Sequence, residues 1–197
     1  MSKTALERIA LSAGDTLIIV DVQNDFLSGG SLAVPDGDAV IPVLNRWIDR
    51  FREAGLPLFA TRDWHPANHC SFLDQGGPWP PHCVVGTEGA EFSPDLTLPP
   101  DVRVHSKAML PEKEAYSDFE DKNFARQLRK LGAKRLFVGG LATDYCVRAT
   151  VLDALKQGFE AILIEDGVRA VNVAPEDGAR ALAEMIGAGA QPIRTKD

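Results

Sequence analysis

The sequence has few cysteines, no long apolar run and no excess of positive charge. Its 197 residues include three cysteines and carry a formal net charge of −7. Proteins that bind nucleic acid or anionic membranes need a basic surface, so the acidic balance argues against both classes. No apolar run could span a bilayer, and the opening residues lack the apolar core of a signal peptide. An odd number of cysteines without such a signal indicates reduced thiols, so we expect a cytoplasmic protein.

The composition is that of a globular protein rather than a disordered one. Hydrophobic residues make up 45% of the chain and charged residues 25%, which is enough apolar material for a core. The length suits one domain better than two, and no repeat or linker divides the chain, so we expect a single domain over residues 1–197. Several helices could carry an interface, and the sequence leaves open whether the chain forms a homo-oligomer.

Short apolar runs alternate along the chain with segments of helical periodicity. The runs predict strands at residues 16–22, 56–62, 102–107, 135–139, 161–165 and 191–194. The periodic segments predict helices near residues 40–54, 117–131, 145–157 and 176–186. A capping box of Ser117 and Glu120 is expected to open the second helix. This alternation predicts an α/β fold with a parallel sheet that helices cover on both faces.

Three reactive side chains, Asp21, Lys107 and Cys146, stand at the carboxyl ends of different predicted strands. Ligands bind at that edge of open α/β sheets. Cys146 falls in the first turn of a predicted helix, where the helix dipole and free N–H groups favour the nucleophilic thiolate. Asp21 could accept the thiol proton and later deliver it to a leaving amine. Lys107 would hold both groups anionic, although Lys113 is close enough in sequence to be an alternative.

Each of these residues also has an ordinary structural interpretation. A cysteine is often a small buried side chain, an aspartate often forms a turn, and a lysine at a strand end is usually solvated. Their combination on one edge of the sheet favours the functional interpretation.

Residues 63–100 form a long stretch rich in Pro, Gly, His and Trp, and a loop of that length is usually functional. Asp63 and His65 stand two positions apart, and His82 follows a rigid proline pair. One carboxylate and two imidazoles suit Zn²⁺, Fe²⁺ or Mn²⁺ with coordination positions left open. His69 is a further candidate ligand. A rival structural zinc site, whose spacing matches no common zinc finger, would consist of His65, His69, Cys70, His82 and Cys83.

Four motifs, in their order and separations, resemble those of the nicotinamidases (pyrazinamidases) in the isochorismatase-like cysteine hydrolase superfamily. They are DVQNDF, TRDWHP, WPPHCVVGTEGAEF and GLATDYCV. The first is typical of the whole superfamily, whereas the second and third carry the metal site that is typical of the nicotinamidase branch. The resemblance covers residues 16–172 and implies a three-layer α/β/α fold with a six-stranded parallel sheet.

The resemblance also implies roles for individual residues. It implies a catalytic triad of Asp21, Lys107 and Cys146. It implies one divalent transition metal per chain, zinc before iron or manganese, held by Asp63, His65 and His82, and it leaves the contributions of His69 and Ser71 open. Phe26 and Trp64 would flank the substrate ring. A cis peptide between Leu141 and Ala142 would aim the Ala142 N–H, with that of Cys146, at an oxyanion.

The activity that the resemblance implies is hydrolysis of nicotinamide to nicotinate and ammonia through a cysteine thioester, with a role in NAD salvage. Pyrazinamide, which keeps the ring nitrogen and the carboxamide, should also react. The nearest alternative is another amidase of the superfamily, such as a carbamoyl-amide hydrolase, which needs no metal. Isochorismatase itself is disfavoured because vinyl-ether hydrolysis needs no thiol. Outside the enzymes, the alternative is a noncatalytic metal-binding or thiol redox module.

Overall fold

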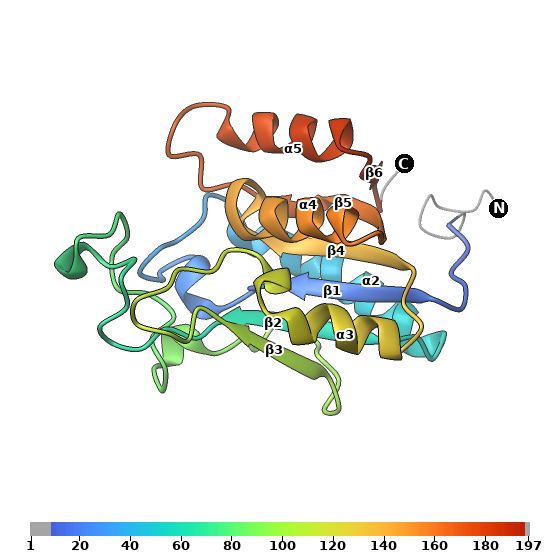
Figure 1. Ribbon diagram of the computed structural model, residues 1–197, viewed down its shortest axis with the longest axis horizontal. Coiled ribbons are helices and arrows are strands. Elements are labelled where there is room, and N and C mark those ends of the chain that lie inside the picture. Colours follow the sequence, from blue (N-terminus) through green and yellow to red (C-terminus); the bar gives the residue numbers. More distant parts are fainter. Residues whose placement is uncertain (1–8, 196–197) are drawn as a thin grey trace.

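The computed structural model describes residues 9–195, which form six strands and four α-helices joined by loops and short turns (Figure 1). The strands are β1 (Asp15–Val20), β2 (Leu58–Asp63), β3 (Arg103–Lys107), β4 (Arg135–Leu141), β5 (Glu160–Arg169) and β6 (Gln191–Ile193). The helices are α2 (Ile41–Glu53), α3 (Lys122–Lys130), α4 (Arg148–Lys156) and α5 (Asp177–Gly187). None of these helices is long and apolar enough to cross a membrane. The first eight residues, which bear on the expected lack of a signal peptide, lie outside the described range.

The six strands form one parallel sheet in the order β3-β2-β1-β4-β5-β6. The chain therefore winds outward from β1 to β3, returns to the centre at β4 and winds outward again to β6. Ligands in such sheets bind where the winding direction reverses, outside the carboxyl ends of the two central strands. In this chain that point lies beyond the ends of β1 and β4.

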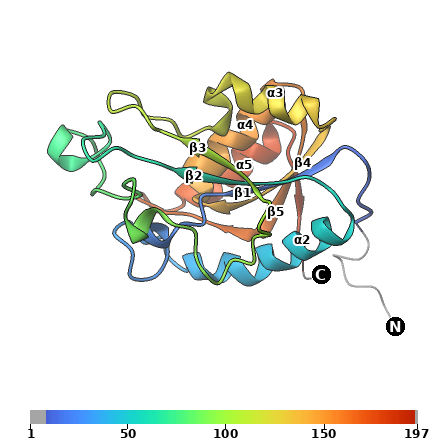
Figure 2. The same ribbon diagram turned by 90° about the horizontal axis from the view of Figure 1, so that it is seen from below.

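Helices cover both faces of the sheet, and Figure 2 shows α2 on one side with α3 and α4 on the other. Leu17 and Ile19 of β1 belong to the core on the α2 side, whereas Ile18 and Val20 belong to the core on the other side. Alternate residues of a strand point to opposite faces, so a strand covered on both faces is apolar along its whole length. The predicted three-layer α/β/α fold is confirmed.

The helix predicted to begin at Ser117 is two separate elements. The Ser117 hydroxyl accepts a backbone hydrogen bond of 3.2 Å and opens only a 3-10 turn, Asp118–Glu120. The Asp121 carboxylate then accepts a backbone hydrogen bond of 2.9 Å and caps α3. The predicted capping box is wrong because a second strong cap residue follows Ser117 and starts the α-helix later.

Gly140 allows the two central strands to meet closely at the point where they end. Its φ is +129°, and a Cβ atom at this position would lie 2.0 Å from the carbonyl oxygen of Val20. Any side chain would push β4 away from β1. The Gly-Gly end of β4 therefore keeps the segments that follow β1 and β4 next to each other.

Candidate active site

The structure brings Asp21, Lys107 and Cys146 together at the reversal point of the sheet. Asp21 directly follows β1, Lys107 ends β3, and Cys146 lies in a π-helical turn between β4 and α4. The Lys107 ammonium nitrogen is 2.7 Å from Asp21 Oδ2 and 3.4 Å from Cys146 Sγ, and it also pairs with Asp63. The side chain of Lys113 is exposed and pairs with Glu120 at 3.3 Å. Lys107 is therefore the lysine at this site.

Neighbouring strand β2 holds Asp21 in place. Asp21 has a left-handed backbone conformation with φ of 49°, which aspartate tolerates better than most residues. Its N–H donates to the Thr61 carbonyl at 3.1 Å, and the Thr61 hydroxyl donates to Asp21 Oδ1 at 2.9 Å. These two bonds direct the other carboxylate oxygen toward Lys107.

Burial controls the protonation of the reactive pair. Burial raises the pKa of the Asp21 carboxyl, while Lys107 opposes the rise and Asp63 adds to it. Burial also raises the pKa of the Cys146 thiol, again against the effect of Lys107. The expected lowering of the thiol pKa is therefore wrong, because Cys146 is only 4% exposed and faces two carboxylates. The site holds a protonated thiol beside a carboxylate of increased proton affinity, which suits proton transfer between them.

Asp63, His65 and His82, the three predicted metal ligands, lie together beside the same group of reactive residues. Asp63 ends β2, and His65 lies two residues later in the chain. His65 forms a β-bridge with the segment that carries His82, and its N–H donates to the Cys83 carbonyl at 3.0 Å. One ligand atom from each of the three side chains lies within 4.8 Å of the other two, and all three residues are buried. This arrangement is compact enough to surround one ion.

The two histidines are oriented as metal ligands usually are. The His65 Nδ1 lies 3.0 Å from the His82 carbonyl, and the His82 Nδ1 lies 2.8 Å from the Pro80 carbonyl. These contacts leave Nε2 of each ring as the ligand atom, and Nε2 of His65 is buried without a hydrogen-bond partner. Burial, with His82 adding to the effect, lowers the pKa of His65 to about 3, so its ring is neutral. The three residues therefore fit a divalent transition metal.

The other candidate ligands do not join Asp63 and His82, since His69 instead groups with His65 and Glu114 in a separate cluster of ligand atoms. The His69 Nδ1 is 2.7 Å from the Ser71 hydroxyl, and its Nε2 is 3.1 Å from the Lys113 carbonyl. Among the described residues, the clusters of ligand atoms that could hold an ion include neither Cys70 nor Cys83. The rival structural zinc group is therefore not assembled.

The two predicted ring-binding residues lie close to this side. The Phe26 ring centroid is 5.6 Å from that of His82. Trp64 stands between Asp63 and His65 in the chain, and the Arg62 guanidinium lies 3.6 Å from its ring centroid. The predicted cis peptide between Leu141 and Ala142 is present.

Sequence reasoning missed an aromatic group beside the thiol. The Trp79 indole N–H donates to the Tyr116 hydroxyl at 3.0 Å, and the Trp79 ring centroid is 5.0 Å from that of Tyr145, the neighbour of Cys146. Trp79 belongs to the same motif as His82, and this closeness in sequence was the available signal. Tyr116 had no such signal because a separate loop carries it.

Gln23 was also missed, although it lies in the DVQNDF motif. Its side-chain amide donates to the carbonyls of Asp63 and Ala90, both at 2.8 Å, and its Oε1 accepts from the Asp63 N–H at 2.8 Å. It therefore fixes the backbone that carries the Asp63 carboxylate.

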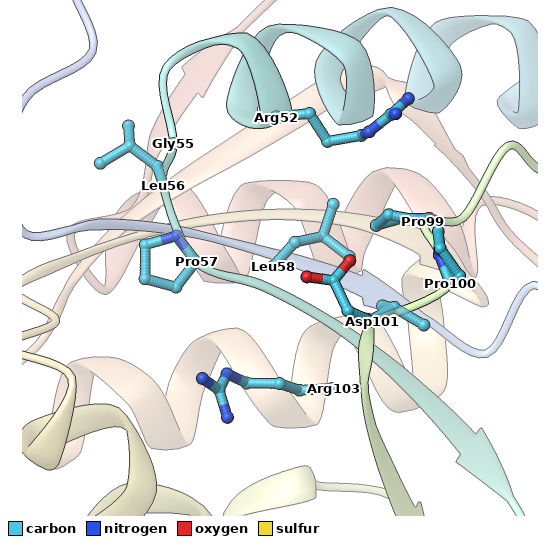
Figure 3. Close-up of a pocket in the computed structure, with 10 residues that line it drawn as sticks. Arg52, Gly55, Leu56, Pro57, Leu58, Pro99, Pro100, Asp101 and Arg103 are labelled. Carbon is cyan, nitrogen blue, oxygen red and sulfur yellow. The ribbon is translucent and has the colours of Figure 1, made fainter.

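A hollow of about 590 Å³ lies at the opposite edge of the sheet (Figure 3). Arg52, Leu58, Pro99 and Arg103 are among the residues that line it. Leu58 and Arg103 begin β2 and β3, whereas Asp63 and Lys107 end them. This hollow is therefore separate from the reactive group.

Comparison with known proteins agrees with the architecture and the motifs. The model of the isochorismatase domain matches residues 15–197. The chain belongs to the isochorismatase family. Within this family, the Escherichia coli (strain K12) protein named nicotinamidase is 44% identical over 196 residues, which cover 88% of this chain and 92% of that protein.

Two solved structures of similar proteins superimpose closely. The zinc complex of a pyrazinamidase from Pyrococcus horikoshii has a TM-score of 0.88 and 52% identity and covers 92% of this chain and 99% of that one. The nicotinate complex of PnC1 from L. infantum has a TM-score of 0.87 and 40% identity and covers 94% of this chain and 96% of that one.

Proposed function

We propose that this chain is a nicotinamidase that hydrolyses nicotinamide to nicotinate and ammonia and also accepts pyrazinamide. The observation that carries the proposal is the pairing of Lys107 with both Asp21 and Asp63. Lys107 therefore links two groups of side chains. One is a thiol and a carboxylate that suit amide cleavage, and the other is a set of three side chains that suits a metal. Amidases of the superfamily without a metal need only the first group. The names of the E. coli nicotinamidase and the P. horikoshii pyrazinamidase, and the nicotinate in the L. infantum complex, support the same substrate class.

Asp63, His65 and His82 would hold one divalent ion, for which zinc is the first candidate. The bound ion would supply a Lewis acid for the pyridine nitrogen of the substrate. The buried Nε2 of His65, which lacks a hydrogen-bond partner, supports this assignment. The zinc complex of the P. horikoshii pyrazinamidase supports the choice of ion.

The first half of the reaction forms the thioester. The Cys146 thiol transfers its proton to Asp21 as the sulfur attacks the carboxamide carbon, and the backbone N–H groups of Ala142 and Cys146 stabilise the oxyanion. The carbon–nitrogen bond then breaks, and Asp21 returns the proton so that ammonia leaves. Lys107 stays charged throughout and offsets the negative charge of sulfur and carboxylate.

The second half consumes one water molecule. Asp21 accepts a proton from water as the water oxygen attacks the thioester carbon. The carbon–sulfur bond then breaks, and the product acid leaves. The Cys146 thiolate takes back the proton that Asp21 holds, and the remaining water proton passes from the product acid to solvent, which leaves nicotinate. Two steps replace one because an amide carbon is a poor electrophile.

Phe26 and Trp64 would flank the pyridine ring, and the proposed place of the reaction is NAD salvage in the cytoplasm. The free thiols of Cys70, Cys83 and Cys146 suit a reducing compartment.

The test is a product assay with the zinc-loaded protein. Nicotinamide should yield equal amounts of ammonia and nicotinate, pyrazinamide should also react, and an N-carbamoyl amide should release far less ammonia. Release from the N-carbamoyl amide alone, without dependence on metal, would instead assign the protein to the carbamoyl-amide hydrolases. Absence of ammonia from every amide would favour a binding module.

A further inference from the structure

Asp118 is a buried carboxyl group that the proposed reaction does not use. It lies in the 3-10 turn before α3, and its relative exposure is 0%. Its Oδ2 accepts a hydrogen bond of 3.1 Å from the Thr150 hydroxyl, whereas its Oδ1 is buried without a hydrogen-bond partner. An ionised carboxylate that is shielded from water needs more donors than this, so the geometry favours the protonated acid.

The position of Asp118 links it to the reactive group on two sides. Thr150 lies on α4, one helical turn beyond Cys146, so its bond to Asp118 ties the turn to the helix that follows the thiol. His105 lies two residues before Lys107 on β3, is buried, and has an Nε2 atom without a hydrogen-bond partner. Asp118 therefore lies in the space behind Lys107, between β3 and α4.

Four groups act on the Asp118 carboxyl: Asp21 just after β1, Asp63 at the end of β2, Lys107 at the end of β3 and Thr150 on α4. The His105 ring on β3 interacts with the Asp118 backbone. Of the charged groups among them, only Lys107 is a cation, and it already pairs with Asp21 and Asp63. A further anion at Asp118 would compete for that cation.

We propose that Asp118 is a positioning residue that sets the alkaline limit of the reaction. As a neutral acid it holds the 3-10 turn against α4, and the positive charge of Lys107 interacts only with the other groups of the site, such as Asp21 and Cys146. As an anion it competes for the positive charge of Lys107 and opposes the negative charge that develops on sulfur and on the oxyanion. The role rests on the proposed function, since it concerns the same reactive group.

The electrostatics of the group agree with this geometry. Burial raises the pKa of Asp118 to about 8, Asp21 adds to the rise, and Lys107 and Thr150 oppose it. The unfolded carboxyl has a pKa of 3.8. The folded chain thus keeps a proton that the unfolded chain releases, so the contribution to stability is complete below pH 3.8 and is lost as the pH rises to about 8.

The test compares Asp118→Asn with Asp121→Asn, an exposed aspartate of the same segment. The measurement is kcat/KM for nicotinamide against pH. The parent and Asp121→Asn should lose activity about tenfold for each pH unit beyond the pKa of Asp118, and Asp118→Asn should lack this alkaline fall.

Thr150→Val removes a bond that lowers the pKa of Asp118, so the alkaline fall of this variant should move to higher pH. The proposal is wrong if the pH profiles of the parent and Asp118→Asn coincide. If Asp118→Asn fails to fold, a shift of the alkaline fall of Thr150→Val to lower pH would overturn it.

A second readout does not depend on activity. The free energy of unfolding of the parent should decrease between pH 5 and pH 8 relative to that of Asp118→Asn, because only the parent keeps a proton on this side chain. A constant difference over that range would mean that Asp118 holds no such proton and would contradict the role. If the parent does not hydrolyse nicotinamide, the proposed function fails, and this measurement still decides whether Asp118 is protonated.

Discussion

Lys107 and Asp21 form an ion pair of 2.7 Å, with only 3% and 0% of their side chains exposed. A pair this well shielded from water interacts more strongly than a surface pair, but each partner also loses its hydration. Buried pairs therefore add little net stability, while removal of one partner is costly. The pair is best understood as an arrangement of charge around the thiol.

Replacement of Lys107 by alanine tests that arrangement. We expect turnover to fall by orders of magnitude and the free energy of unfolding to fall by about 3–5 kcal/mol, because Asp21 and Asp63 are left as unpaired buried charges. Alkylation of Cys146 by iodoacetamide at neutral pH should also slow, since Lys107 lowers the thiol pKa. Lys113→Ala, at an exposed surface pair, should change all three measurements little. The role fails if Lys113→Ala is the variant that stops turnover.

Loss of either Asp63 or His82 should remove the metal. We expect His82→Ala and Asp63→Ala to bind less than a tenth of the zinc that the parent binds, as measured by elemental analysis after gel filtration. His105→Gln is the matched control, because His105 is a buried histidine that stacks on Phe124 and lies outside the ligand clusters. Equal zinc in all three variants and the parent would show that the metal site lies elsewhere.

The layers of the fold and most of the reactive residues could be predicted from the sequence because their signals are local. A continuous apolar run predicts a strand buried on both faces, and the residue that follows it lies at the ligand-binding edge. Asp21 follows this rule directly, whereas Lys107 ends the more polar β3 and Cys146 lies in the turn that leads from β4 into α4. The thiol pKa could not be predicted, because it depends on Asp63 and on burial, which only the folded arrangement brings to Cys146.

The missed residues depend on contacts between distant parts of the chain. Gln23 bonds to Asp63, which is 40 positions away, and Trp79 bonds to Tyr116, which is 37 positions away. No spacing in the sequence reports such pairs. Asp118 is a similar case, since an aspartate next to a predicted cap looks like a solvated residue until its burial against Thr150 is known.

The buried neutral ring of His65 predicts acid sensitivity of the protein after chelator treatment. The folded ring has a pKa of about 3, below its unfolded value of 6.5, so the unfolded chain takes up a proton that the folded chain does not. This contribution to stability is complete above pH 6.5 and is lost as the pH falls toward 3. Chemical denaturation at several pH values should therefore show a smaller decrease for His65→Gln than for the parent. An equal decrease in both proteins would contradict the neutral state of His65.

The central claim is that the Cys146 thiol carries out amide hydrolysis at a metal-bound site, and the most direct test is ammonia release from nicotinamide by zinc-loaded Cys146→Ala. Cys70→Ala is the matched control, because Cys70 is a half-buried cysteine outside the reactive group. We predict that Cys70→Ala releases ammonia at about the parental rate. Cys146→Ala should bind the same amount of zinc and release no ammonia above the uncatalysed background. Release by Cys146→Ala within a few-fold of the parent would contradict the covalent mechanism.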